Sequence, residues 1–341
     1  MSETAQRVKG ADLTHYTPPD PARWTGRVDD LDDRDAFRWH QVIECLDLSA
    51  PIGEHAARSP RGFCVLGYCC DHGVELNLGR TGAEKGPQAI RTQLANLPVN
   101  FPETVRLYDG GDIHSQDGDL EGAQRALAGA VERALASGLF PVILGGGHDL
   151  AFGHYLGISQ YLPSEKRLGI VNFDAHLDLR PLRPAATSGT MFTQIAADCR
   201  ERGTNFSYLC VGAQKSANTV SLFRMAEELG VETVLAKDID DADLAPVRQK
   251  LDAFLAGNDA VYVTICADVF SSAFAPGVSA PQPFGLHPET VLRLLKRVLA
   301  SGKVVSLDFA EVSPRFDSDD NTAKLAAVFI FALVDTLGTD T

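Results

Sequence analysis

Six short segments of the chain are almost continuously apolar, and they constrain its fold more than any other feature. They lie at residues 63–70, 139–146, 167–174, 206–213, 260–268 and 303–311. A strand that is covered on both faces loses the alternation of polar and apolar residues, which is typical of parallel sheets. The sequence therefore predicts a mostly parallel β-sheet that is buried between two layers.

Helical patterns lie between these segments. In residues 119–136, apolar residues recur at steps of three and four and form one apolar face. Residues 287–300 and 321–336 show the same period, with Gly302 and Gly338 near the predicted ends. Strands that alternate with helices predict a three-layer, doubly wound α/β domain.

The domain organisation is predicted to be simple. Residues 1–60 are rich in Asp, Arg and Pro and are predicted to form an N-terminal extension that packs on the core. Residues 61–341 contain no repeat, low-complexity segment or linker, which favours a single domain.

Composition and hydropathy argue against nucleic acid and membranes as partners. The formal net charge of −14 argues against nucleic-acid binding, which usually needs a basic surface. The first residues lack the apolar core of a secretory signal, and the longest apolar run, ten residues at 325–334, is too short to span a bilayer. The seven scattered cysteines favour reduced thiols, so we expect a cytoplasmic protein with no membrane partner.

Four of the apolar segments run directly into residues of metal-ligand type. These residues are His148, the run Asp174-Ala-His176-Leu-Asp178, Asp268 and Glu311. Ligands of open α/β sheets bind outside the carboxyl ends of the strands, so these side chains are expected to meet in one crevice.

Each of these residues also has a simpler interpretation. If the strand continues to Asp178, alternate residues point to one side and offer three ligands, but a solvated acidic loop would have the same sequence. His148 follows three glycines and could merely neighbour a helix cap. Cys266 could be a small buried residue and Asp268 a turn former, while Glu311 could be a capping or surface carboxylate.

The combination of residues favours a metal site. Carboxylates that lie close together repel one another unless a cation neutralises them. The mixture of carboxylates and imidazoles is more typical of a Mn²⁺ site than of a cysteine-rich zinc site. Two ions that share carboxylates would lie roughly 3.5–4 Å apart and would lower the pKa of a bridging water.

At these residues the sequence resembles the ureohydrolase family, which includes arginases, agmatinases and formimidoylglutamases. The resemblance covers about residues 60–335 through GRTGAEKGPQAIR, DGGDI, GGGHD, NFDAHLD and ADVFSSAFAPGVSAP, and its last motif is the run that contains Glu311. It implies an arginase-type α/β fold with two Mn²⁺ ions bridged by hydroxide. The segments at 23–41, 73–87, 172–192 and 275–286 are most similar to the formimidoylglutamase group.

The resemblance implies a ligand set. His148, Asp174 and Asp178 would hold one ion, and Asp174, His176 and Asp268 would hold the other. The sequence departs from the pattern at Cys266, where arginase-like members have a second bridging aspartate. A thiolate there could still coordinate and would favour Zn²⁺, or a thiol could leave the second metal weakened. A further departure is Ser188, where agmatinases have a histidine.

The resemblance also implies roles in hydrolysis. Asp178 would take a proton from the nucleophile and pass it to the leaving amine, and Glu311 would pair with the cationic formimidoyl nitrogen. Arg180 stands where arginases have an asparagine that contacts the substrate α-carboxylate, and a guanidinium suits a carboxylate well. The further candidates for substrate binding are Arg80, Arg183, Ser188, Thr190 and Asn218. His72, His154 and His287 are expected to be structural.

The implied reaction is hydrolysis of N-formimidoyl-L-glutamate to L-glutamate and formamide, a step of histidine degradation. The expected partner is a small anionic substrate derived from an amino acid, and a homo-oligomer is implied by the family. Two alternatives remain: another amidine or guanidine hydrolase, such as a guanidinobutyrase or an agmatinase, or a metal-depleted, non-catalytic binding protein on the same fold.

Overall fold

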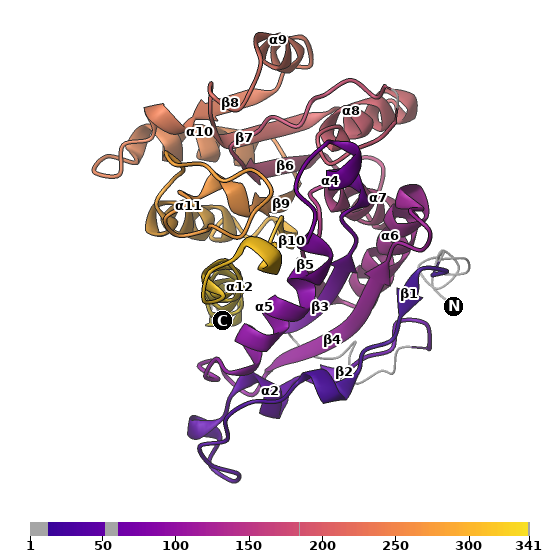
Figure 1. Cartoon of the computed structure of the whole chain (residues 1–341), viewed down its shortest axis with the longest axis vertical. Coiled ribbons are helices and arrows are strands. Elements are labelled where there is room, and N and C mark those ends of the chain that lie inside the picture. Colours follow the sequence, from indigo (N-terminus) through magenta and orange to yellow (C-terminus); the bar gives the residue numbers. More distant parts are fainter. Residues whose placement is uncertain (1–12, 52–60, 184, 340–341) are drawn as a thin grey trace.

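The computed structural model describes residues 13–51, 61–183 and 185–339, and a ten-stranded sheet forms its middle (Figure 1). The strand order is β1-β4-β3-β5-β10-β9-β6-β7-β8, and β2 also pairs with β4. In the described ranges β1 runs antiparallel to β4, and the other pairs are parallel. The strands are β1 (Tyr16–Thr17), β2 (Glu44–Cys45), β3 (Arg61–Cys69), β4 (Val105–His114), β5 (Leu139–Leu144), β6 (Leu168–Phe173), β7 (Ser207–Ala213), β8 (Glu232–Leu235), β9 (Ala260–Cys266) and β10 (Val304–Ala310).

Helices cover both faces of the sheet, which confirms the predicted three-layer α/β fold (Figure 1). One face packs against α5 (Gly86–Ala95), α10 (Ala245–Ala256), α11 (Pro288–Leu299) and α12 (Asn321–Thr339). The other packs against α6 (Leu120–Ala136), α7 (Leu150–Tyr161) and α8 (Met191–Arg202). The remaining α-helices of the described residues are α2 (Trp39–Val42), α4 (His72–Leu76) and α9 (Val220–Glu228).

The central strand β9 shows why its sequence lacks alternation. Val261, Val263 and Ile265 belong to one apolar core, and the intervening Tyr262 belongs to the other. All four side chains are fully buried. Full burial of a large apolar side chain contributes roughly 1.5–3 kcal/mol, so both faces of the strand select apolar residues.

Strand β4 was not predicted, because its centre reads Asp-Gly-Gly-Asp and resembles a turn. Asp109 and Asp112 are both buried in the structure. The fully buried guanidinium of Arg91, on α5, donates to Asp109 over 2.9 Å and to Asp112 over 2.6 Å. Neutralisation by a cation from another element lets this acidic segment lie inside the molecule.

The described part of the N-terminal segment adds to the edge of the sheet. Strands β1 and β2 both pair with β4. The indole Nε1 of Trp24 donates to Asp109 over 2.7 Å, and the ring of Trp39 lies edge-on to Phe101 at 5.9 Å. Residues 1–12 and 52–60 of the predicted extension lie outside the described residues. The domain boundary near residue 60 stays a prediction.

Helix α12 continues past its predicted end, so that Gly338 lies inside the helix. By length and composition it is the one helix in the described residues that could cross a membrane, yet 56% of its most apolar window is buried inside the protein. Phe329, Ile330 and Leu333 pack in the core. This burial is typical of a core helix.

Candidate metal centre and active-site cavity

Four neighbouring strands carry the predicted ligands at their carboxyl ends. Strands β5 and β6 follow each other in the chain, but β10 and β9 lie between them in the sheet (Figure 1). Such a separation opens a crevice at the carboxyl ends of the strands. Loops from the four strands therefore meet at this point.

The glycine run after β5 is required by close contacts. A Cβ on Gly145 would lie 2.2 Å from the backbone oxygen of Phe309 on β10. The loop then turns back, so that the backbone N–H of His148 donates to Glu311 Oε1 over 2.9 Å and the Glu311 N–H donates to the Gly146 oxygen over 2.8 Å. These two bonds fix His148 and Glu311 relative to each other.

The segment after β6 does not continue as an extended strand, so that part of the prediction was wrong. Strand β6 ends at Phe173, and Asp178 has a φ of +48°. Backbone in this region is uncommon for residues other than glycine and marks a tight, constrained loop. The side chains of Asp174, His176 and Asp178 nevertheless reach the same space because the loop bends.

The loop is held by side-chain hydrogen bonds. Asn218 accepts from the Leu177 N–H over 2.9 Å and donates to the Ala175 oxygen over 2.9 Å. Asp174 Oδ1 accepts from the His176 N–H over 2.7 Å. Asn218, predicted as a substrate ligand, thus lines the cavity while its amide positions the ligand loop.

The candidate metal ligands converge on two overlapping groups. Nδ1 of His148 lies 3.1 Å from Asp174 and 3.2 Å from Asp178, and Nδ1 of His176 lies 3.1 Å from Asp268 and 3.5 Å from Asp174. Ligand atoms lie within 4.8 Å of one another in two triads, His148–Asp174–Cys266 and Asp174–His176–Asp268. Asp174 is common to both.

The donor set fits a metal ion. His148 Nδ1 and Asp268 Oδ1 are buried and make no hydrogen bond to the described residues, although carboxylates lie close to His148. Buried polar atoms are rarely left without a partner, because the cost is about 1–3 kcal/mol for each. These ligand atoms lie close to neighbouring ligand atoms without forming hydrogen bonds, which is the arrangement expected around a bound cation.

The electrostatics of the acids agree with this fit. Burial, together with the charge of Asp174, raises the pKa of Asp178 to about 6. Burial also raises the pKa of Asp268, and it raises the pKa of Glu311 to about 8. For Asp174, burial opposes ionisation, but the imidazoles of His148 and His176 outweigh it and lower the pKa. The protein alone thus supplies too little positive charge for these carboxylates.

A buried hydrogen-bond chain orients His148. Thr264 on β9 donates its hydroxyl proton to Asp308 over 2.6 Å, and His148 Nε2 lies 2.9 Å from the same hydroxyl oxygen. Because the Thr264 proton is engaged, its oxygen accepts the proton on Nε2. When the His148 imidazole is neutral, the lone pair of its Nδ1 then faces the ligand cluster, as metal coordination requires.

Asp308 also contacts the predicted structural histidine. Nδ1 of His154 lies 2.7 Å from Asp308, and Tyr262 donates to the same carboxylate. His154 is therefore part of the support behind the cluster. His287 caps α11, and His72 lies 3.0 Å from Glu75.

Cys266 lies at the cluster, as the sequence predicted. Its thiol lines the cavity beside His148 and Asp268. Burial, followed by the charges of Asp174 and Asp268, raises the pKa of the thiol well above its ordinary value. Without a cation beside it, the group stays a neutral thiol.

The cluster forms the floor of a cavity of about 290 Å³. This volume lies at the lower end of the range of small-molecule sites, roughly 300–1,000 Å³. Of the substrate-binding candidates, Arg80, Arg180, Ser188 and Asn218 line the cavity. Thr190 is not among the described residues that line it, and its hydroxyl is hydrogen-bonded to Thr187 and to Gln194 on α8.

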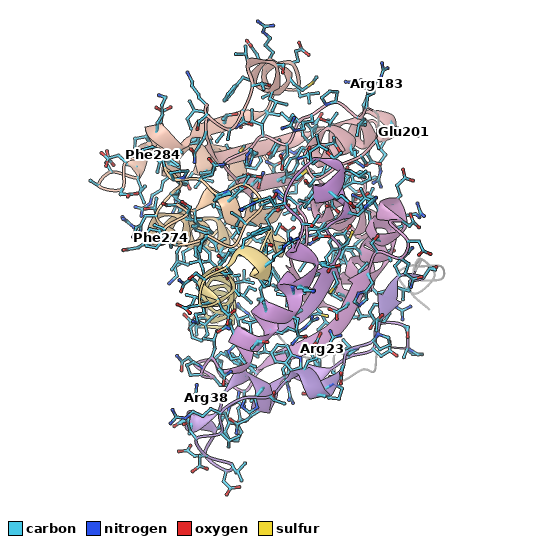
Figure 2. The ribbon with its side chains drawn as sticks, in the orientation of Figure 1. Arg23, Arg38, Arg183, Glu201, Phe274 and Phe284 are labelled. Atoms are coloured by element: carbon cyan, nitrogen blue, oxygen red, sulfur yellow. The ribbon has the colours of Figure 1, made fainter. Side chains whose placement is uncertain are left out.

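The arginines differ in their availability. Nε and Nη2 of Arg80 donate to the Ser279 and Val278 oxygens over 2.9 and 2.6 Å, which ties two cavity loops together. Arg183 does not line the cavity and lies at the periphery (Figure 2). Arg180 lines the cavity, and its guanidinium donates no hydrogen bond to another described residue. It therefore has the donors that are free for a ligand.

Several residues that line the cavity were not predicted from the sequence. Asn77, Leu78 and Gly79 after α4, and Ser279 and Ala280 from the loop after β9, complete the wall. The only signal for them in the sequence was their position inside the motifs that carry the family resemblance. Thr264 and Asp308 had no such signal in the sequence. Their contacts with each other and with His148 depend on the pairing of β9 with β10 and on the fold around them.

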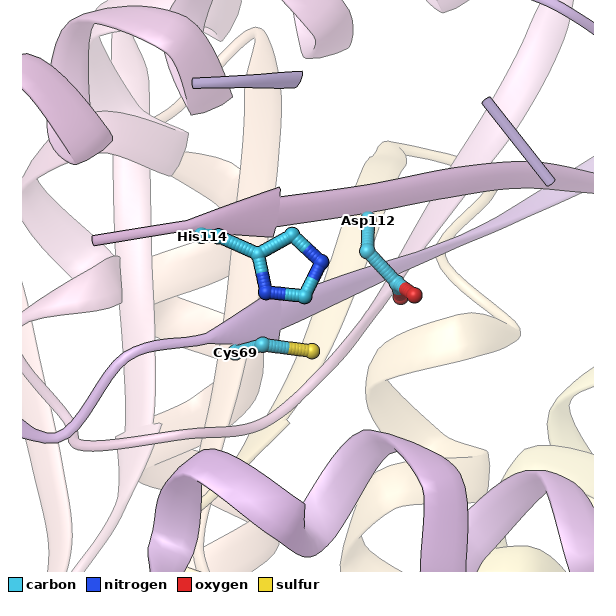
Figure 3. Close-up of side chains that lie close together, drawn as sticks. All are labelled: Cys69, Asp112 and His114. Atoms are coloured by element: carbon cyan, nitrogen blue, oxygen red, sulfur yellow. The ribbon is translucent and has the colours of Figure 1, made fainter. Parts of the chain in front are cut away.

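A second group of ligand-type residues lies away from the cavity. Cys69 on β3 and Asp112 and His114 on β4 point toward one another (Figure 3), and their ligand atoms lie within 4.8 Å. Both oxygens of Asp112 already accept from arginines, one from Arg91 and one from Arg23. The carboxylate is neutralised, so this group does not share the shortage of positive charge seen at the cavity.

Comparison with known proteins identifies the family. Residues 61–335 match the Arginase family. The chain belongs to the arginase family. It is 48% identical to the formimidoylglutamase of Clostridium tetani (strain Massachusetts / E88), over 95% of this chain and 96% of that protein. It is 44% identical to the formimidoylglutamase of Geobacillus thermodenitrificans (strain NG80-2), over 92% of this chain and 95% of that protein.

Solved structures agree with the fold. The chain matches Trypanosoma cruzi formiminoglutamase with Mn²⁺ at a TM-score of 0.75 and 25% identity, covering 86% of this chain and 97% of that chain. It matches formimidoylglutamase from Bacillus subtilis at a TM-score of 0.77 and 21% identity, covering 91% and 94%. The latter likeness concerns the fold alone. The arginase-type fold predicted from the sequence is confirmed.

Proposed function

We propose that this protein hydrolyses N-formimidoyl-L-glutamate to L-glutamate and formamide. The observation that carries the proposal is the 48% identity, across nearly the whole of both chains, with a formimidoylglutamase. The cavity supports it, because a cluster of carboxylates and imidazoles lies beside the free guanidinium of Arg180. Such a cavity suits a substrate with a cationic amidine at one end and carboxylates at the other.

We further propose that the cluster holds two Mn²⁺ ions. His148, Asp174 and Asp178 would hold one, and Asp174, His176 and Asp268 would hold the other. Cys266 lies close enough to contribute a sulfur ligand to the first group. The ions, when bound, supply Lewis-acid activation of water at neutral pH and offset negative charge. The Mn²⁺ of the T. cruzi formiminoglutamase structure supports this choice of ion.

Asp178 is the side chain to which we assign the proton transfers of the hydrolysis. Asp178 lies at the wall of the cavity and is placed to accept a proton from the attacking water. The water oxygen bonds to the formimidoyl carbon, and the carbon–nitrogen bond to glutamate breaks. Asp178 then returns this proton to the departing amino group, and the hydroxyl proton of the adduct also passes to that group as the carbonyl of formamide forms. Formamide and glutamate, with its amino group protonated, then leave.

Glu311 and Arg180 would bind the two ends of the substrate. Oε1 of Glu311 accepts from the His148 N–H, whereas Oε2 is buried with no partner among the described residues. An amidinium N–H would satisfy Oε2 and supply the positive charge that the buried carboxylate lacks. Arg180 would bind a carboxylate through its guanidinium, and the Ser188 hydroxyl would contribute a hydrogen bond nearby.

The test is a product assay on the purified protein. Incubation with N-formimidoyl-L-glutamate after Mn²⁺ loading should release formamide, and a chelator should abolish the release until Mn²⁺ is restored. Metal analysis should find two Mn²⁺ for each chain. Full activity in the chelator-treated protein would refute the metal-dependent mechanism.

Parallel assays decide between the alternatives. Urea from agmatine, arginine or guanidinobutyrate, without formamide from N-formimidoylglutamate, would replace the proposal with another guanidine hydrolase. No turnover of any substrate at full metal occupancy would indicate a non-catalytic binding protein. We do not expect agmatine hydrolysis, because Ser188 replaces the histidine of agmatinases and Arg180 would repel the cationic tail of agmatine. The 48% identity with a formimidoylglutamase argues against the other outcomes.

The expected cytoplasmic location and homo-oligomeric state stay predictions. Cell fractionation tests the first, and light scattering coupled to size-exclusion chromatography tests the second. We expect no co-purification with nucleic acid, because the chain carries a net charge of −14.

A further inference from the structure

The turn that begins at Thr187 lies against the side chain of Arg180. The Arg180 N–H donates to the Gly189 oxygen over 2.9 Å, so the two segments run side by side. A Cβ added to Gly189 would lie 2.8 Å from Arg180 Cδ and 3.0 Å from Arg180 Nε. The third neighbour is Asn77 Nδ2, at 3.1 Å. Because Gly189 has no side chain, the Cδ and Nε atoms of Arg180 can occupy the space beside it.

The turn itself is held rigidly. The Thr187 hydroxyl accepts from the Gly189 N–H over 3.1 Å, and the Thr187 N–H donates to the Thr190 hydroxyl over 2.8 Å. The Ser188 N–H donates to the Gly73 oxygen on α4 over 2.9 Å. Because these bonds fix the backbone, a methyl group at position 189 could not move away from Arg180. The flexible side chain of Arg180 would have to move instead.

Backbone conformation does not require glycine at this position. Gly189 is absent from the glycines with positive φ among the described residues, so alanine can adopt its backbone geometry. The two closest atoms belong to a side chain that is otherwise free to rotate. A change to alanine should therefore cost little stability while it displaces the guanidinium from the cavity wall.

We propose that Gly189 is a specificity-determining position, whose missing side chain lets Arg180 reach over the cavity and bind a carboxylate of the substrate. The proposal rests on the function proposed above, and it adds a positioning residue for which neither composition nor motif spacing gave a sign. Arg180, Asn77 and Ser188 all line the cavity, so the contact lies directly at the wall that the substrate must face.

The experiment is a double-mutant cycle on the Mn²⁺-loaded protein with Gly189→Ala, Arg180→Ala and the combined variant. Gly189→Ala should raise KM for N-formimidoyl-L-glutamate roughly tenfold or more, as expected for loss of a charged hydrogen bond, and leave kcat within about twofold. In the Arg180→Ala background, Gly189→Ala should change KM no further, because the residue that it displaces is gone. Additive effects of the two changes would overturn the proposal, as would an unchanged KM in Gly189→Ala.

Two further measurements distinguish the role of Gly189 from an effect on folding and from a failure of the proposed function. Gly257→Ala is the matched control, since no atom lies closer than 3.4 Å to its added Cβ, and it should keep wild-type KM and thermal stability. Titration calorimetry with L-glutamate reports carboxylate binding without turnover. If the wild-type protein does not hydrolyse N-formimidoylglutamate, the proposed function fails, and L-glutamate binding alone decides the role of Gly189. Weaker binding in Gly189→Ala would support that role, and equal or no binding in both proteins would refute it.

Discussion

The two clusters of metal-ligand residues in this molecule have similar composition but opposite electrostatics. The cavity cluster, His148, Asp174, His176, Asp178, Cys266 and Asp268, combines carboxylates with two imidazoles and contains no arginine. The edge cluster consists of Cys69, Asp112 and His114 (Figure 3). Its one carboxylate accepts from both Arg91 and Arg23. Residue types alone do not distinguish a metal site from a structural one. The cations that each cluster receives from its surroundings do.

The difference follows from position in the sheet. The edge cluster lies where β3 and β4 meet the N-terminal segment and α5, and both supply arginines that replace a cation. The cavity cluster lies at the carboxyl ends of central strands, where loops leave the sheet and a crevice remains. Its orphaned atoms, His148 Nδ1 and Asp268 Oδ1, have no counterpart in the edge cluster among the described residues. Two buried ligand atoms without a hydrogen-bond partner within one cluster of carboxylates and imidazoles therefore distinguish the cavity cluster from the edge cluster.

The largest expected effect is loss of the metal centre in Asp174→Asn. Asp174 belongs to both ligand triads, so its removal should abolish binding of at least one ion. Loss of several kcal/mol of charge stabilisation should reduce formamide release on the order of a thousandfold. Metal analysis and the product assay measure both effects. Asp259→Asn, at the opposite end of β9, is the control and should keep both metal and activity.

Arg91→Met tests the edge cluster, where we expect a loss of stability without a loss of metal. Removal of the fully buried guanidinium leaves Asp109 and Asp112 short of positive charge, which should lower the free energy of unfolding by about 3–5 kcal/mol. Urea denaturation of the metal-loaded protein measures the loss. Metal content of the folded fraction should not change, and a variant that lost Mn²⁺ without losing stability would contradict the distinction between the clusters. Arg297→Ala, which breaks an exposed pair with Asp252, should unfold like the wild type.

A smaller effect is expected from Thr264→Val, which keeps the shape of the side chain but removes the hydroxyl behind His148. Loss of a group that orients a metal ligand typically reduces metal affinity by about 10–100-fold. Titration of the stripped protein with Mn²⁺ measures the affinity without reference to activity. Thr264→Ser restores the hydroxyl and should recover most of the affinity. Equal affinity in the valine and serine variants would show that the hydroxyl does not orient His148.

A strand of this fold could be predicted from the sequence only where the residues of that strand alone show that it is buried. The six apolar segments were found because each strand is buried on both faces, as in β9. Strand β4 was not, since its acids become compatible with a buried strand only when Arg91 approaches from α5. A sequence pattern records the solvent exposure of its own residues but not the charge of a partner that arrives through the fold.

The same limit applies to the site. His148, Asp174, His176, Asp268 and Glu311 could be predicted because they follow apolar strands directly. The reason given for the Asp174–Asp178 segment was nevertheless wrong, since a bent loop rather than a strand brings its side chains together. Thr264 and Asp308 face each other only through the pairing of β9 with β10, in which they are register partners. The approach of Gly189 to Arg180 likewise depends on tertiary structure, and no spacing in the sequence announces it.

The smallest expected effect is a pH dependence confined to the edge cluster. Burial opposes ionisation of Asp112, but Arg91 and Arg23 outweigh it and lower its pKa below the ordinary value of 3.8. A carboxyl group with a lowered pKa in the folded state stabilises the protein fully above its unfolded pKa, and this contribution is lost as the pH falls through the folded pKa. The difference in unfolding free energy between the wild type and Asp112→Asn should thus be constant from pH 7 to about 5 and should shrink below about pH 4. Guanidinium denaturation at each pH measures it, and a difference that grew on acidification would show that the arginines do not hold this carboxylate in its charged form.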